Sequence, residues 1–89
     1  MFEFDITKSN FNKAKHGIDF IEAQALWMDS DLIKIEAKQT DELRMMAIGK
    51  IKEKSWSAII VRRNGKIRLI SVRRARKEEE RLYESQRIG

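Results

Sequence analysis

Residues 57–72 of this 89-residue chain read SAIIVRRNGKIRLISV in one-letter code, and this stretch decides the fold. Two runs rich in apolar residues, 57–63 and 66–72, flank Asn64-Gly65. Asn-Gly between such runs is the strongest short-range signal for a β-hairpin, because its turn needs positive φ at both positions. The second half of the chain is therefore expected to contain an antiparallel pair of strands.

Further strands are expected before this hairpin. The two-residue period of a strand appears over residues 32–36 and again over residues 44–51. At the start of the chain, Phe2 and Phe4 alternate with Glu3, which predicts a short opening strand. Together with the hairpin, these segments predict a sheet of four or five antiparallel strands.

Three helices complete the expected fold. Asp5 is a good N-cap for the first helix, and Gly17 is a good left-handed residue to end it. Asp19 and Glu22 resemble a capping box at the start of a second, largely apolar helix. A third helix is expected over residues 73–86. The predicted class is α+β, with two N-terminal helices, an antiparallel sheet and a C-terminal helix.

Composition limits the class of protein. A chain of 89 residues suits one domain, here residues 1–89. It has no cysteine and one histidine, so the sequence predicts neither disulfides nor a structural zinc site, and it fits a reducing cytoplasm. The N-terminus is acidic and without a long apolar run, and no segment approaches the ~20 apolar residues that span a bilayer. We expect a cytoplasmic protein without a metal or cofactor.

The charge is unevenly distributed along the chain. Residues 1–43 contain five basic and nine acidic side chains, a net −4, whereas residues 44–89 contain fourteen and five, a net +9; the two halves give the overall +5. Every arginine lies at or after Arg44. Because guanidinium groups match phosphate and carboxylate oxygens, this half favours a polyanion or an acidic protein as partner. A solvated basic surface fits the charge equally well.

Several short motifs follow one another over nearly the whole chain: Asp5-x-x-Lys8, Asn12-x-x-Lys15-His16-Gly17, Asp19-Phe20-x-Glu22-Ala23, Glu42-x-Arg44, Ile48-Gly49, Arg68-Leu69-Ile70-Ser71-x-Arg73-x-Ala75, Glu79 and Tyr83. Their order and spacing together resemble those of the BrnT-type toxins. Two positions depart from the family pattern. Phe4-Asp5 replaces the usual Trp-Asp, and Arg76 stands where a serine or threonine often precedes the last helix, so an N-cap hydroxyl is lost.

The resemblance implies a RelE-like ribonuclease toxin of a type II toxin–antitoxin system. Such a toxin would be a metal-independent endoribonuclease that cleaves RNA and arrests growth. Its implied partner is a BrnA-type antitoxin with a ribbon-helix-helix DNA-binding domain. The expected complex is a hetero-tetramer of two toxins and two antitoxins, which contacts DNA only through the antitoxin.

Arginines are the first candidates for the chemistry. RNA cleavage without a metal needs a base for the 2′-hydroxyl, an acid for the leaving 5′-oxygen, and cations for the charge that develops at phosphorus. Arg44, Arg68 and Arg73 coincide with the resemblance and are expected to supply those cations. Strand alternation points Arg68 and Arg73 to opposite faces, so they can share a site only if a bulge or the strand end reorients Arg73.

Other catalytic candidates each have a structural alternative. His16 could act as acid or base, because histidine is the residue type whose charge changes near neutral pH, or could stabilise the end of its helix. Lys8, two turns earlier, could face the same groove or be solvated. Glu42 could be a base or pair with Arg44. Tyr83 could stack on a base or donate a proton, or could pack in the core.

A second group of residues is expected to attract RNA without taking part in the chemistry. Arg62, Arg63 and Arg74 could contact phosphates or be solvated. Of the two tryptophans, Trp56 is expected to be more exposed than Trp27, and so the better platform for a base. Two alternatives to a nuclease remain open, namely a non-catalytic basic module that binds RNA or DNA, and a protein-interaction domain.

Overall fold

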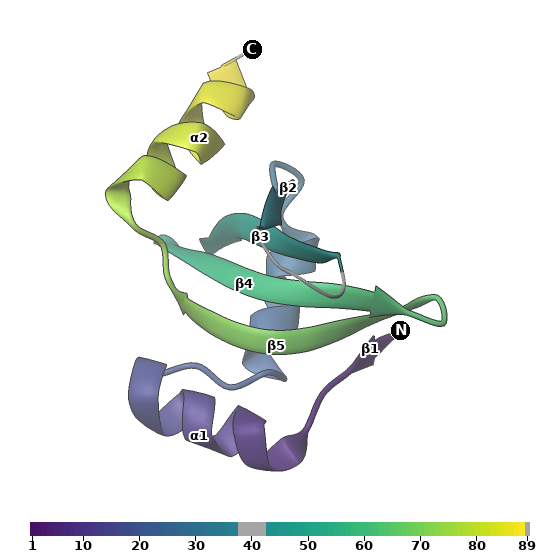
Figure 1. Cartoon of the computed structure of the whole chain (residues 1–89). Helices are drawn as coiled ribbons and strands as arrows, with labels where there is room; N and C mark the ends of the chain where they lie inside the picture. Colours follow the sequence, from purple (N-terminus) through teal and green to yellow (C-terminus); the bar gives the residue numbers. More distant parts are fainter. Residues whose placement is uncertain (38–42, 89) are drawn as a thin grey trace.

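The structure is a computed structural model that describes residues 1–37 and 43–88 (Figure 1). Glu42 lies outside the described residues. The elements, in chain order, are β1 (Phe2–Glu3), α1 (Ile6–His16), the 3-10 helix η1 (Glu22–Met28), β2 (Ile33–Ala37), β3 (Arg44–Ile51), β4 (Lys54–Arg63), β5 (Lys66–Arg74) and α2 (Lys77–Ile88).

The five strands form one mixed sheet in the order β1-β5-β4-β3-β2. Strands β2 to β5 are antiparallel to their neighbours, but β1 pairs with β5 in parallel, Phe2 opposite Ile67. The expectation of a purely antiparallel sheet is therefore wrong. The amide of Ile67 donates to the carbonyl of Met1 over 2.8 Å, which fixes the chain start along the outer edge of β5. The alternation of apolar and polar side chains that predicted these strands does not show whether two paired strands run parallel or antiparallel.

The second expected α-helix is wrong in type, because residues 22–28 form a 3-10 helix. The capping-box contacts are present: Asp19 Oδ1 accepts from the amides of Ile21 and Glu22, and Glu22 Oε1 accepts from the amide of Asp19. A 3-10 helix aligns residues i and i+3, and the fully buried Ala23 and Leu26 have that spacing. Because Ala23 and Leu26 are the residues that η1 buries against the sheet, their spacing favours a 3-10 helix over an α-helix.

The hairpin at Asn64-Gly65 is confirmed, with φ of 50° and 76° at the two turn residues. The last helix begins later than expected, at Lys77, because β5 continues to Arg74. The amide of Ala75 still donates to Ser55 of β4 over 3.0 Å. The expected start of this helix at residue 73 is therefore wrong, and Arg73 and Arg74 belong to the strand.

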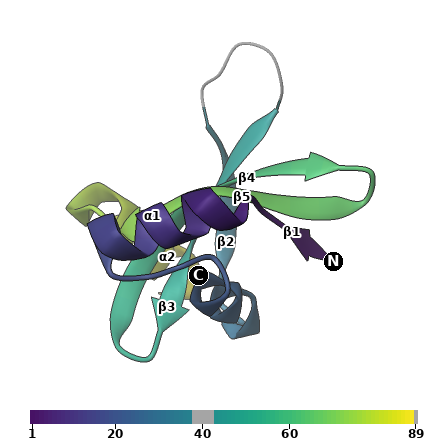
Figure 2. The same cartoon turned by 90° about the horizontal axis from the view of Figure 1, so that it is seen from below.

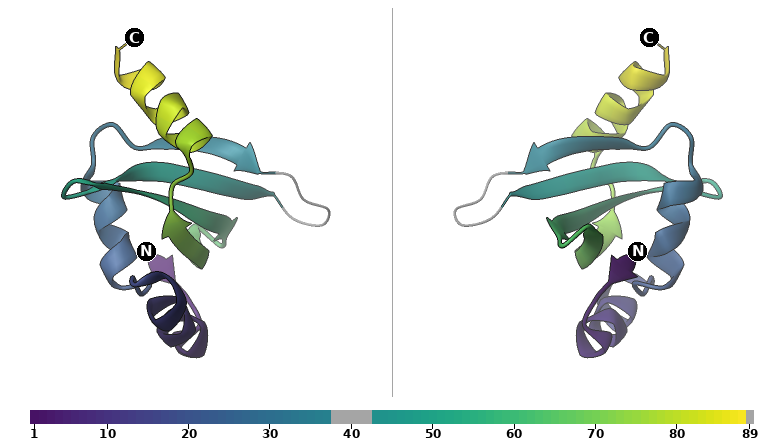
Figure 3. Two further views of the ribbon diagram at one scale, coloured as in Figure 1. Left: turned by 90° about the vertical axis from the view of Figure 1, so that its left-hand side faces the viewer. Right: turned by 90° about the vertical axis from the view of Figure 1, so that its right-hand side faces the viewer.

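The core lies between one face of the sheet and the segment that contains η1. Phe20 and Leu26 form one buried cluster there with residues of two adjacent strands, Trp56, Ala58 and Ile60 of β4 and Ile67, Leu69 and Val72 of β5. Figure 3 shows η1 against this face, with α1 and α2 on opposite sides of the sheet. The other face of the sheet therefore carries the side chains that alternate with the core residues.

Candidate active site

A bulge in β5 places three polar side chains on one face of the sheet. Ile60 pairs with Leu69 and Ile59 pairs with Ser71, so Ile70 is the extra residue. After the bulge the alternation is reversed. Arg68, Ser71 and Arg73 are therefore paired with Val61, Ile59 and Ser57, which point away from Trp56, Ala58 and Ile60 of β4. Arg68 and Arg73 thus share a face, and the bulge is one of the two ways in which the sequence allowed this.

Arg44 lies on this same face. It is paired across β3 and β4 with Val61, and Val61 is paired with Arg68, so the two arginines flank one buried valine. Adjacent strands are about 4.8 Å apart, which places the Arg44 and Arg68 backbones about 10 Å apart. Arg68 is 3.8 Å from Glu3 Oε2, a loose ion pair across the parallel strands. We call the surface of Arg44, Arg68, Ser71 and Arg73 the arginine face.

Arg73 is held by Glu79 in the first turn of α2. Its Nη1 and Nη2 donate to Glu79 Oε1 and Oε2 over 2.9 and 2.8 Å, a bidentate ion pair. Glu79 also accepts from the hydroxyl of Ser57 and from the amide of Arg76. These contacts, led by Arg73, lower the pKa of Glu79 to about 2, and the same pair raises the pKa of Arg73. Glu79 therefore forms the N3 half of a capping box by accepting from the amide of Arg76, whereas the side chain of Arg76 has no acceptor for the other half.

A groove of about 510 Å³ lies between α1 and β5. Lys8, Lys15 and His16 line it from the helix, and Ser71 lines it from the strand. The remaining lining residues are Thr7, Phe11, Asn12 and Ile70. We call this concavity the α1–β5 groove. Because Ser71 belongs both to the groove and to the arginine face, the two surfaces adjoin.

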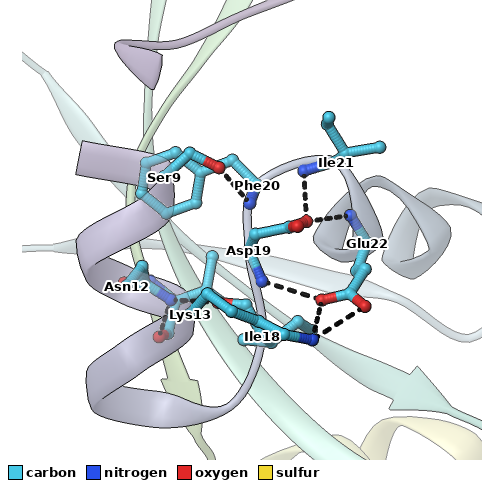
Figure 4. A network of polar contacts seen from close by, with 9 residues as sticks. Ser9, Asn12, Lys13, Ile18, Asp19, Phe20, Ile21 and Glu22 are labelled. Atoms are coloured by element: carbon cyan, nitrogen blue, oxygen red, sulfur yellow. Dashed lines mark hydrogen bonds and ion pairs between the residues drawn. The ribbon is translucent and has the colours of Figure 1, made fainter. Parts of the chain in front are cut away.

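Buried polar side chains fix α1 against the sheet. Asn12 Nδ2 donates to the carbonyls of Ile18 and Val72 over 2.8 and 2.9 Å, and Asn12 Oδ1 accepts from the amide of Val72. The side chain of Asn12 thus pairs with the edge of β5 as a strand would. Ser9 Oγ accepts from the amide of Phe20 (Figure 4). Figure 2 shows α1 alongside β5, and these contacts set the position of its cations.

A family model described as the ribonuclease toxin BrnT of type II toxin–antitoxin systems matches residues 4–79. The chain belongs to the BrnT family. A search of curated proteins gives no significant match. The matched residues of this BrnT-family chain include the whole α1–β5 groove and the arginine face, and they end at Glu79. Family membership makes the chain a ribonuclease toxin of a toxin–antitoxin system, whose partner is a protein antitoxin.

Two expected RNA contacts have roles inside the BrnT-family fold. Trp56 is only 8% exposed and belongs to the core, whereas Trp27 is half-buried, so the expectation that Trp56 is the more exposed tryptophan is wrong. The guanidinium of Arg74 lies 5.5 Å from the ring of Trp56 and its Nε donates to the carbonyl of Ser55. Arg74 is thus on the core side of β5, away from the arginine face.

Tyr83 is buried, with 2% of its surface exposed. Its hydroxyl donates to Asp29 Oδ2 over 2.7 Å, and burial together with that carboxylate raises the pKa of the phenol to about 12. Asp29 also accepts from the amide of Lys50. Tyr83 therefore ties α2 to Asp29 at the end of η1, and through Asp29 to Lys50 of β3. Its ring is buried and so unavailable for stacking on a base.

The remaining candidates lie in two separate places, the hairpin end of β4 and the α1–β5 groove. Arg62 and Arg63 are exposed at the end of β4, next to the hairpin turn. Lys8 is exposed, and His16 ends α1, where the amide of Gly17 donates to the carbonyl of Lys13. Within residues 1–37 and 43–88, no three histidine, aspartate or glutamate side chains are grouped as a metal site would require. No helix in the same part of the chain is long and apolar enough to cross a membrane.

Sequence reasoning gave no role to three residues that shape the site. Asn12 was visible only as part of a motif, yet it holds the helix to β5. Ser71 joins the groove to the arginine face, and Ile70 is the bulge residue. A polar residue on the inner side of a helix was the available signal for Asn12. The bulge had no signal, because Ile70 fits a regular strand equally well.

Proposed function

We propose that this chain is a metal-independent endoribonuclease toxin that arrests growth by cleaving RNA at the border of the α1–β5 groove and the arginine face. The observation that carries this proposal is the position of Ser71. It brings the cations of α1 next to the arginines of β5 and β3, so that one stretch of RNA backbone can contact both. Family membership supplies the class of reaction.

The reaction we propose is attack of a ribose 2′-oxygen on the adjacent phosphorus. The bond from phosphorus to the 5′-oxygen breaks, which leaves a 2′,3′-cyclic phosphate on one fragment and a 5′-hydroxyl on the other. His16, at the end of the groove, exchanges protons with the attacking or leaving oxygen. Lys8, Arg68 and Arg44 stabilise the negative charge that develops on the phosphate oxygens. Side chains thus supply the positive charge that metals supply in other nucleases.

Arg73 has a conditional role in this proposal. Both of its terminal nitrogens are bonded to Glu79, so in this conformation the guanidinium has little capacity left for phosphate. Its side chain is 26% exposed. We assign Arg73 the positioning of α2 against the sheet, and a phosphate contact only when Glu79 releases it. Glu42 stays a candidate base from the sequence alone.

The proposed partner is a BrnA-type antitoxin with a ribbon-helix-helix domain, in a complex of two toxins and two antitoxins. The overall charge of +5 favours an acidic inhibitory segment. Such a segment could cover Arg44 and Arg68 with carboxylates and so exclude RNA. DNA contacts in this complex belong to the antitoxin.

The test is incubation of purified, antitoxin-free protein with end-labelled RNA in EDTA. Fragments that end in a 2′,3′-cyclic phosphate are expected. H16Q and R68A should each reduce the cleavage rate at least tenfold, and R62A, which removes an exposed arginine outside the proposed site, should not. Intact RNA in the presence of folded wild-type protein would overturn the nuclease assignment. Retained, salt-sensitive RNA binding without cleavage would support the non-catalytic module.

A further inference from the structure

Phe11 is an exposed aromatic residue on the cationic side of α1. It is 68% exposed, although it lines the α1–β5 groove. Lys8 lies three positions before it and Lys15 four positions after it, so the three side chains share one helix face. A phenyl ring that is exposed between two lysines contributes little to the core. This arrangement matches the aromatic and basic surfaces that bind single-stranded nucleic acids.

The opposite wall of the groove supports the same reading. Ile70 and Ser71 of β5 form that wall, and Ile70 is the extra residue of the bulge. The groove is therefore apolar at Phe11 and Ile70 and cationic at its margins. Among the described residues that line it, none is acidic. Its volume of about 510 Å³ lies within the ~300–1,000 Å³ typical of small-ligand sites.

We propose that the α1–β5 groove binds one unpaired nucleotide of the RNA substrate, with its base stacked on Phe11 and its flanking phosphates on Lys8 and Lys15. This inference rests on the proposed ribonuclease function and adds the substrate class, which is single-stranded RNA. Bases inside a duplex are stacked on each other and cannot reach Phe11, whereas an unpaired base can turn outward. Aromatic stacking accepts every base, so the groove selects for strandedness rather than sequence.

The binding experiment uses the full chain and a fluorescent 2′-O-methyl RNA, which lacks the attacking hydroxyl and cannot be cleaved. F11A should weaken binding of an unpaired oligonucleotide by about 5- to 150-fold, the range for loss of one stacked base. F11W should retain most of the affinity, and F11L should lose most of it. I6A is the matched control, because Ile6 is 59% exposed on the same helix but does not line the groove.

An abasic oligonucleotide tests stacking more directly. Moving one abasic site along the RNA should identify a position at which wild-type affinity falls to the level of F11A. For the RNA with its abasic site at that position, F11A should bind with the same affinity as wild type. Thermal melting of each variant confirms folding, which an exposed side chain should not affect.

The outcomes separate this inference from the proposed function. RNA affinity that is the same in F11A as in wild type, with normal cleavage, overturns the inference and leaves the nuclease standing. Binding that depends on Phe11 without any cleavage supports the inference and overturns the nuclease. Equal losses for single-stranded and duplex RNA contradict stacking. Unchanged RNA binding together with loss of antitoxin binding in F11A would assign the groove to the protein partner instead, and overturns the inference.

Discussion

Replacement of Glu79 by glutamine tests the link between α2 and the arginine face. The carboxylate accepts two bonds from Arg73, one from Ser57 and one from the amide of Arg76. Its pKa falls from an ordinary 4.5 to about 2. At about 1.36 kcal/mol per pKa unit, this difference corresponds to about 3 kcal/mol of folding free energy at pH 7. E79Q should therefore lower the free energy of unfolding by about 2–3 kcal/mol at that pH.

The pH dependence gives this prediction its sign. A carboxyl with a lowered folded pKa stabilises the protein fully above its unfolded pKa of 4.5, and this contribution is lost as the pH falls towards 2. Urea unfolding at pH 7 and pH 3 should show the difference in unfolding free energy between wild type and E79Q fall from about 2–3 to about 1 kcal/mol.

A matched control is available at the neighbouring position. Glu78 is exposed in the same helical turn, and E78Q should cost only the ~0.3–1 kcal/mol of a charge near a helix N-terminus. A gap for E79Q that is equal at the two pH values, or no larger than that of E78Q, would refute the reasoning.

Three further predictions concern the frame that holds the site. N12A should lower the free energy of unfolding, measured in urea, by about 3 kcal/mol, because it removes the Asn12 partners of the Val72 amide and carbonyl. A loss below ~1 kcal/mol would contradict this prediction. Tyr83 is the only tyrosine, so an ultraviolet titration reports it alone, and its midpoint should lie near pH 12; a midpoint near 10 in folded protein would mean that the bond to Asp29 is absent. G49A should lower the melting temperature and cost about 1–3 kcal/mol, because a Cβ there would lie 2.9 Å from Leu32 Cδ1; wild-type stability would show that the Leu32 side chain can move away.

Local signals accounted for much of the fold. Asn64-Gly65 correctly predicted the hairpin, Arg44–Ile51 was predicted with its observed bounds, and Asp5 and Gly17 cap α1 as expected. Each of these signals depends on a few adjacent residues, whose conformational preferences are the same in any fold. Such features can be read from sequence.

Features that depend on tertiary packing could not be read in this way. The parallel pairing of β1 and the 3-10 form of η1 depend on how distant segments meet the sheet. The position of Trp56 depends on strand β4 starting at Lys54, before the apolar run. The shared face of Arg68 and Arg73 depends on a bulge opposite another strand. From the sequence, the two arginines were expected on opposite faces unless a bulge or the strand end reoriented Arg73.

The central claim is that α1 and β5 contribute to a single catalytic site. Its most direct test is a double-mutant cycle between Lys8 and Arg68 on the single-turnover rate of RNA cleavage. Residues that stabilise the same charge act as a unit, so K8A-R68A should lose much less activity than the product of the two single losses. A rate for the double variant that equals the product of the single effects would contradict one shared site.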